Sequence, residues 1–181
     1  FSTPTSFGKG LSNVYDGEIA FVDHHLKPVF ERLAAPEFAQ NTLVILTSDH
    51  GEAFKEHGFY FHGRTVYNEE IAVPMMIRIP GVKGQRVTQR AGLVDLLPTL
   101  GELTGVDTPE AQGESLVGLW VGSGPTPERP IFSEQLPYPN YKKHIVSAIE
   151  REGDLKVIRN ITENIIEVFN LASDPKESKN L

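Results

Sequence analysis

An aspartate and a histidine that follow an apolar run are the residues most able to do chemistry in this chain. The run Leu43-Val44-Ile45-Leu46 leads to Asp49-His50-Gly51, and His57 and His62 follow within the next dozen residues. A carboxylate beside an imidazole is a pair of metal ligands, and the glycine after them permits a tight turn. The pattern predicts a metal site. The alternative is a strand-to-loop turn in which Asp49 caps a following helix and His50 lies in solvent.

Strands must place these side chains, and two are expected nearby. Residues Asn41–Thr47 predict a buried strand, and open α/β sheets gather ligands at the carboxyl ends of such strands. A second strand is expected in the apolar run within Glu69–Ile79. It should begin near Pro74, because proline lacks the N–H that a strand ladder uses.

Helices are expected on either side of these strands. Apolar spacing over Val14–Leu33 fits one face of a helix, and Pro28 is expected to kink or break it. Leucines over Leu93–Leu103 predict a second helix, bent by Pro98 or beginning near it and ended by Gly105.

The composition changes after the second helix. Residues 108–129 are rich in Pro, Gly and Ser, with Gly122-Ser123-Gly124-Pro125 as a breaker cluster. Strand-like pieces follow, with a hairpin turn expected at Glu152-Gly153-Asp154. The expected strands are Pro130–Glu134, His144–Glu150, Leu155–Asn160 and Ile165–Leu171. We therefore predict an α/β part over residues 1–107, a linker over 108–129 and a small antiparallel sheet subdomain over 130–181.

Composition and charge exclude several classes of protein. The net charge is -7 with no basic block, so nucleic acid is not an expected partner. No stretch approaches the ~20 apolar residues of a membrane span, and no signal-like amino terminus is present. The absence of cysteine excludes disulfides and thiolate metal ligands but identifies no compartment. Residues 1–10 are rich in Ser, Thr, Pro and Gly and begin without Met, so we expect a truncated or cleaved chain.

The order of the motifs resembles the carboxyl-terminal half of a sulfatase, within the alkaline phosphatase superfamily. The similar segments are Tyr15–Asp23, Asn41–Glu52 continuing to Glu56-His57-Gly58, Val73–Arg78 followed by Val94–Leu100, and Val168–Leu171 with Asp174, Pro175 and Glu177. Each signal alone is weak, but four in the family's order are specific. The resemblance implies part of a mixed α/β sheet flanked by helices, followed by a small antiparallel sheet.

The resemblance also implies roles for individual residues. Asp49 and His50 occupy the family's metal-binding positions, with calcium expected first and magnesium, manganese or zinc as alternatives. His62 stands where many members place a lysine that contacts the sulfate group, so it is expected to bind substrate or act as a general acid. Arg64 is an alternative cationic contact. His57 is expected to support the site, although packing of the loop through a hydrogen bond explains His57 equally well. The less favoured alternative for His62 is a histidine on a surface loop.

One expected feature is absent. Sulfatases make their nucleophile, formylglycine, inside a Cys/Ser-x-Pro-x-Arg motif, whereas this chain has no Cys and Ser2-Thr3-Pro4-Thr5-Ser6 lacks the Arg. The resemblance implies that the complete protein is a metal-dependent sulfuric ester hydrolase acting on a small-molecule sulfate ester. The chain alone, with two metal ligands at most, is expected to bind metal weakly and to be inactive.

Two other functions stay open on the sequence. One is a phosphatase, phosphodiesterase or phosphonate monoester hydrolase of the same superfamily, acting on a phosphate ester. The other is a non-catalytic metal-binding or scaffold domain. The compartment and the oligomeric state are not indicated by any pattern in the chain.

Overall fold

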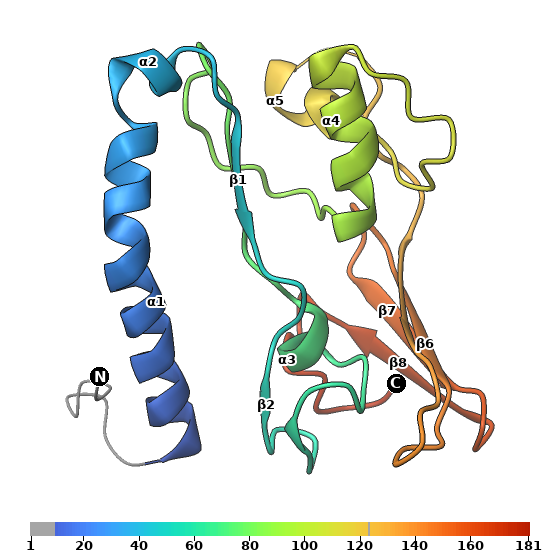
Figure 1. Ribbon diagram of the computed structural model, residues 1–181. Helices are drawn as coiled ribbons and strands as arrows, with labels where there is room; N and C mark the ends of the chain where they lie inside the picture. The colour runs from blue at the N-terminus through green and yellow to red at the C-terminus, as the bar shows by residue number, and fades with distance from the viewer. Residues whose placement is uncertain (1–9, 123) are drawn as a thin grey trace. The chain divides into compact units, whose positions relative to one another are not determined.

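The computed structural model describes residues 10–122 and 124–181, and these divide into two compact units. The first unit comprises residues 10–48, 54–60 and 74–84. The second comprises residues 49–53, 61–73 and the described residues from 85 to 181. Figure 1 shows the elements of both, coloured along the chain. The segment Ser2–Ser6 and Ser123 of the breaker cluster lie outside the described residues.

The first unit holds two helices and an antiparallel strand pair. Its elements are α1 (Leu11–Leu33), α2 (Pro36–Ala39), β1 (Val44–Thr47) and β4 (Met75–Arg78). The predicted first helix is confirmed, but Pro28 does not break it, and α1 continues to Leu33. A proline removes one N–H from the helix, and the bonds on either side carry the helix past it. The Ala34 N–H, for example, bonds the Phe30 carbonyl at 2.9 Å.

The strand that leads to Asp49 forms, but it begins at Val44 rather than Asn41 and it is not fully buried. In β1 the Leu46 side chain is 36% exposed, because β4 is the neighbour that β1 has among the described residues. Thr47, the last residue of β1, lies opposite Met75, the first of β4. That β4 begins directly after Pro74 confirms the position predicted from the missing proline N–H.

The second unit is built on a four-stranded sheet. Its order is β5-β6-β7-β8, and every neighbouring pair is antiparallel, which confirms the small antiparallel sheet. The strands are β5 (Ile131–Gln135), β6 (Ile145–Ile149), β7 (Leu155–Asn160) and β8 (Ile165–Asn170). The earlier strands β2 (Ala53–Phe54) and β3 (Tyr60–Phe61) have two residues each.

One short helix packs on this sheet and forms the core of the second unit. Helix α3 (Asn68–Ile71) contributes Ile71, and Val66 lies just before it. These side chains meet buried residues from three sheet strands and the turn after β8. The buried core residues are Val66, Ile145, Ile158, Phe169 and Leu171. Burial of apolar surface of this kind is the main term that stabilises such a contact. The segment 61–73 is therefore fixed to the sheet.

The second predicted helix is confirmed, together with its ends. It consists of a 3₁₀ turn, η2 (Leu93–Asp95), and α4 (Leu96–Thr104). Pro98 lies in the first turn, where its missing N–H has no helical partner to lose. Gly105 ends the helix at φ 72°, a left-handed conformation that favours glycine. A further helix, α5 (Val117–Val121), forms inside the segment that composition suggested as a linker.

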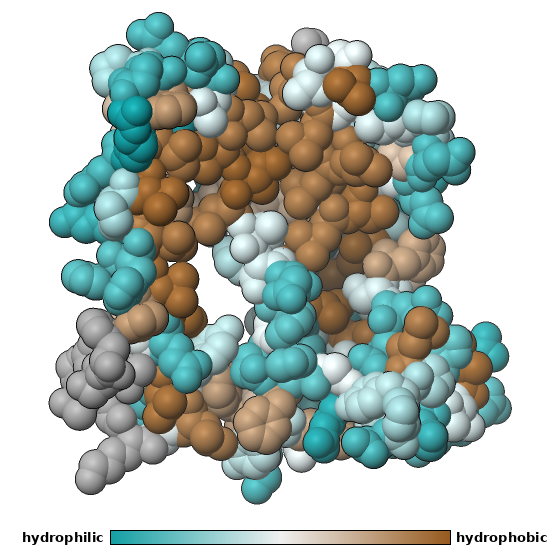
Figure 2. All heavy atoms as spheres, viewed as in Figure 1, coloured by the Kyte–Doolittle hydropathy of each residue, from teal (hydrophilic) through white to brown (hydrophobic). Residues whose placement is uncertain are grey.

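Apolar residues are exposed around α4 and α5. Leu97 is 54% exposed and Val121 is 53% exposed. Figure 2 shows this part of the second unit as a hydrophobic surface. No helix among the described residues is both long enough and apolar enough to span a membrane.

Candidate functional site

Asp49 and His50 are oriented by short contacts within their own turn. The His50 N–H donates to Asp49 Oδ1 at 3.0 Å, and His50 Nδ1 lies 2.8 Å from the Gly51 carbonyl oxygen. Because a carbonyl oxygen can only accept, Nδ1 must carry a proton, and the lone pair of the neutral ring is then on Nε2. His50 Nε2 lies 3.7 Å from Asp49 Oδ2. The turn therefore presents one nitrogen and one oxygen lone pair side by side.

This pair fits a divalent cation as two of its ligands. Ligand atoms at about 2.0–2.5 Å from one ion lie about 3–4 Å apart, which matches the separation of Nε2 and Oδ2. The Asp49 side chain is 86% exposed, so its carboxylate is accessible from solvent. Across the part of the chain that the structure describes, no group of three or more His, Cys, Asp or Glu could hold a metal. Among the described residues, Asp49 and His50 could therefore offer a cation two ligands at most.

His62 lies beside this pair. Its ring stacks on the ring of His50, with centroids 4.0 Å apart and an angle of 29° between the planes. Its Nδ1 lies 3.1 Å from Glu52 Oε2. One pair of rings and one carboxylate therefore hold His62 beside the candidate metal ligands, and Glu52 is a member of the site to which the sequence assigned no role.

Glu70 binds both the loop that carries Asp49 and His50 and the loop that carries His62 and Arg64. Sequence reasoning offered no reason to single out Glu70. Its side chain is buried, and Oε2 accepts the N–H groups of Arg64 at 3.0 Å and Thr65 at 3.3 Å. Oε1 accepts the Thr65 hydroxyl at 2.7 Å. The Glu70 backbone carbonyl accepts the Gly51 N–H at 2.7 Å. No periodic pattern in the sequence could have identified Glu70, because Val66, the core residue four positions earlier, lies before the helix Asn68–Ile71.

Gly51 is required where these loops meet. A Cβ at this position would lie 2.2 Å from the Glu69 carbonyl oxygen, far inside contact distance. The sequence suggested a glycine for a tight turn, and the structure instead gives a close backbone approach as the reason. The loop that carries Asp49 and His50 is thus pressed against the end of α3.

The sheet in turn anchors α3. The Asn68 N–H donates to Glu177 Oε2 at 2.6 Å, and Lys156 Nζ donates to Asn68 Oδ1 at 3.0 Å. Lys156 and Glu177 form an ion pair at 2.5 Å whose side chains are both 0% exposed. Burial lowers the pKa of Lys156, against the opposing effect of Glu177. A continuous set of polar contacts therefore leads from β7 and the end of the chain through α3 to the site.

The remaining predicted site residues lie in different places. Arg64 belongs to the same unit as Asp49, with its backbone bound to Glu70 and its side chain exposed. His57 belongs to the other unit, in the segment 54–60, so its supporting role stays a prediction.

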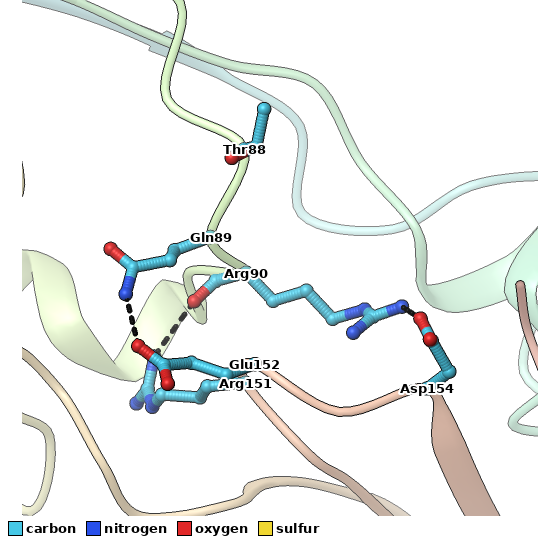
Figure 3. A pocket seen from close by; sticks show the side chains of 6 residues that line it. All are labelled: Thr88, Gln89, Arg90, Arg151, Glu152 and Asp154. Atoms are coloured by element: carbon cyan, nitrogen blue, oxygen red, sulfur yellow. Dashed lines mark hydrogen bonds and ion pairs between the residues drawn. The ribbon is translucent and has the colours of Figure 1, made fainter.

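A second polar region lies at the turn between β6 and β7. A hollow of about 370 Å³ is lined by Thr88, Gln89, Arg90, Arg151, Glu152 and Asp154 (Figure 3). The Arg90 guanidinium pairs with Asp154 at 3.5 Å and also donates to the Gly153 carbonyl. Because the cations here are already paired, an anionic ligand would have to displace a carboxylate. The hollow is therefore a poorer candidate for a substrate site than the region around Asp49, His50 and His62.

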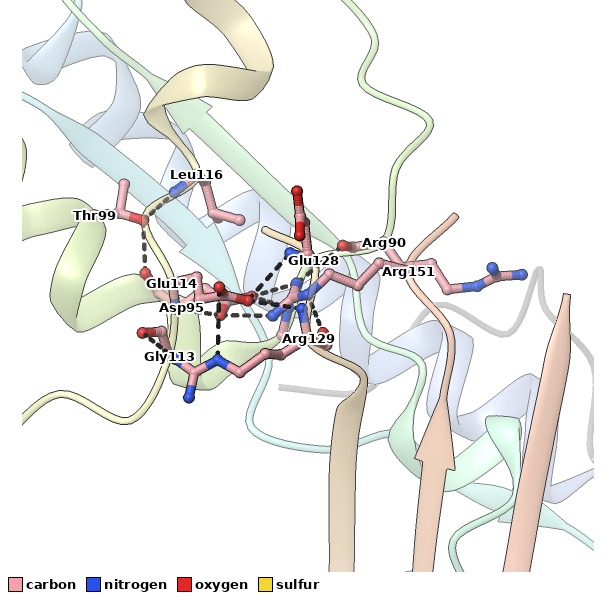
Figure 4. A network of polar contacts seen from close by, with 10 residues as sticks. Arg90, Asp95, Thr99, Gly113, Glu114, Leu116, Glu128, Arg129 and Arg151 are labelled. Atoms are coloured by element: carbon pink, nitrogen blue, oxygen red, sulfur yellow. Dashed lines mark hydrogen bonds and ion pairs between the residues drawn. The ribbon is translucent and has the colours of Figure 1, made fainter. Parts of the chain in front are cut away.

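The same turn is fixed to α4 by a buried ion pair. Arg151 binds both oxygens of Asp95, at 2.8 and 2.9 Å, and Asp95 is 0% exposed (Figure 4). Burial raises the pKa of the Asp95 carboxyl, but hydrogen bonds from Arg151 and from the N–H groups of Glu114 and Gly92 outweigh it, and the pKa is lowered. This ion pair therefore joins η2 to the turn after β6.

Two family models match the chain. The model described as sulfatase covers residues 2–106, and the model described as N-sulphoglucosamine sulphohydrolase, C-terminal, covers residues 55–181. Together they extend across both the site and the four-stranded sheet.

Curated relatives show the same similarity. The uncharacterized sulfatase YidJ of Escherichia coli is 29% identical over 162 residues, which is 89% of this chain and 32% of that protein. The choline-sulfatase of Rhizobium meliloti is 28% identical over 172 residues, 92% of this chain and 32% of that protein. Human arylsulfatase K is 33% identical over 113 residues, 61% of this chain and 21% of that protein. The chain therefore spans about a third or less of their length.

Solved structures share the fold. BT4656, in complex with its substrate D-glucosamine-2-N,6-O-disulfate, matches with a TM-score of 0.76 and 25% identity, over 93% of this chain and 35% of that one. BT1596, a 2-O GAG sulfatase, matches with a TM-score of 0.77 and 24% identity, over 99% of this chain and 41% of that one. With two family models that each match more than half of its residues, the chain belongs to the sulfatase family.

Proposed function

We propose that this chain is the carboxyl-terminal part of a metal-dependent sulfatase, in which Asp49 and His50 supply two ligands to a divalent cation. The observation that carries the proposal is the 3.7 Å separation of His50 Nε2 and Asp49 Oδ2, with the His50 ring oriented by the Gly51 carbonyl. Membership of the sulfatase family supports it. Calcium is the first candidate, and magnesium, manganese or zinc are alternatives.

The residues around this pair suit a sulfate ester. A bound cation would withdraw electron density from the oxygens of the sulfate group. His62 and Arg64 lie on the same loop and offer donors to an anion, a role that many members of the family give to a lysine. Gly51 and Glu70 hold this loop against the turn that carries Asp49 and His50.

The nucleophile is proposed to lie outside this chain. The chain has no cysteine, and none of its serines stands in the Cys/Ser-x-Pro-x-Arg pattern. Relatives about three times as long leave room for a nucleophile and for further metal ligands. We extend to the complete protein a small-molecule sulfate ester as substrate, with sulfated amino sugars first to be tested because BT4656 binds one.

Paired substrates test the proposal. The complete protein is assayed with 4-nitrophenyl sulfate and 4-nitrophenyl phosphate, before and after treatment with a chelator. The proposal expects faster release from the sulfate and loss of that activity with the chelator. Preference for the phosphate would assign phosphoryl chemistry instead, and no turnover of either by metal-loaded protein would favour a non-catalytic domain.

A further inference from the structure

Glu52 contacts the imidazole ring of His62, which the proposed reaction needs. Its side chain is 16% exposed, against 51% for His62, and its Oε2 accepts from His62 Nδ1 at 3.1 Å. The other oxygen, Oε1, is buried and has no hydrogen-bond partner among the described residues. A half-buried carboxylate that directs one oxygen at a histidine is an arrangement that fixes the orientation of an imidazole ring.

The hydrogen bond to Glu52 determines which ring nitrogen of His62 is available to a substrate. Since a carboxylate only accepts, Nδ1 carries a proton in every state that keeps this bond, and Nε2 is the nitrogen left for a substrate. The stack on His50 restricts the same ring from its face. The Glu52 carboxylate and the stacked His50 ring together leave the Nε2 edge of His62 to contact a substrate.

We propose that Glu52 is a positioning residue that holds His62 as the proton donor to the leaving group, an inference that rests on the proposed function. The nucleophile, proposed to lie outside this chain, forms a bond to sulfur as the S–O bond to the leaving group breaks. The electron pair of the broken bond passes to the leaving oxygen, and that oxygen takes the proton from His62 Nε2. The ring then keeps the Nδ1 proton that Glu52 binds. Glu52 itself gains and loses no proton, and water returns the proton to Nε2 in the next turnover.

A double-mutant cycle tests this inference in the complete protein. The variants are Glu52→Ala, His62→Ala and the pair, with a sulfated sugar as a poor leaving group and 4-nitrophenyl sulfate as a good one. General acid catalysis is typically worth about 10²–10⁴-fold, so His62→Ala should lower kcat for the sugar sulfate by about that factor. Loss of an orienting partner should cost about 10–100-fold.

Coupling separates positioning from a general structural effect. If Glu52 acts through His62, Glu52→Ala causes no further loss in the protein that already lacks the imidazole. Glu52→Gln keeps an acceptor for Nδ1–H and should recover most of kcat. The nitrophenyl ester, whose leaving group needs little protonation, should lose much less than the sugar sulfate in each variant. The matched control is Glu102→Ala, an exposed glutamate on α4, with activity expected to be unchanged.

Each contrary outcome is distinct. Losses that multiply in the double variant would overturn the inference, and so would loss of bound metal from Glu52→Ala, measured by elemental analysis. Equal losses on both esters would remove the role of His62 as proton donor. Failure of the unaltered protein to hydrolyse any sulfate ester would refute the proposed function rather than the position of Glu52, which the 3.1 Å contact already gives.

Discussion

Substitution of Glu70 by alanine should loosen the site without breaking the sheet. The substitution removes the acceptor of three donors, the N–H groups of Arg64 and Thr65 and the Thr65 hydroxyl, at 3.0, 3.3 and 2.7 Å. A buried donor left without a partner costs about 1–3 kcal/mol. Water can reach the vacated space beside the exposed Arg64, so we expect a local loss of about 2–5 kcal/mol rather than the full sum.

Hydrogen exchange of the two loop amides measures this loss where it occurs. A local loss of about 2–5 kcal/mol corresponds to exchange about 30 to 5,000 times faster at Arg64 and Thr65. Glu70→Gln, which keeps one acceptor oxygen, should lie between the variant and the unaltered protein. Glu102→Ala should leave these amides as they are. Unchanged exchange at both amides in Glu70→Ala would refute the assignment of Glu70 as the residue that holds the loop.

Two further predictions concern the buried ion pairs of the second unit. Lys156→Met leaves Glu177 charged and buried, which should lower the free energy of unfolding by about 3–5 kcal/mol, and Lys156→Met with Glu177→Gln should recover part of it, both measured by urea unfolding. Asp95→Asn should cost about 3 kcal/mol at neutral pH because Arg151 loses its counter-charge. Since the pKa of Asp95 is lowered from 3.8 in the folded state, this stabilisation is present above that pH and is lost as the pH falls below it. The difference between Asp95→Asn and the unaltered protein should therefore shrink in acid, and a difference that grows there would contradict the assignment.

Much of the fold could be predicted because apolar residues recur with the regular spacing of helices and strands. The helix that ends at Leu33 and the four strands of the sheet carry patterns that a single sequence displays. The exposure of Leu46 could not be predicted, because it depends on which strands pair with β1 and not on the residues within it.

In the candidate site, too, some features could be predicted from the sequence and others could not. Asp49, His50 and His62 could be proposed as site residues from the sequence, because their residue types and spacing are those of metal and anion binding. No periodic pattern in the sequence predicts that Glu52 pairs with His62, ten residues away. The same holds for the hydrogen bonds that Glu70 accepts from Thr65. The pairing of Arg151 with Asp95 spans 56 residues, and such contacts follow only once the chain has folded.

The most direct measurement of the central claim is the metal dependence of sulfate release. The complete protein and its Asp49→Ala variant are stripped with a chelator, and sulfate release from 4-nitrophenyl sulfate is followed as calcium is returned. We expect activity to return in the unaltered protein, while Asp49→Ala needs at least about 100-fold more calcium or stays inactive. Full activity of the unaltered protein after chelation, or the same calcium dependence in both proteins, would contradict a metal held by Asp49 and His50.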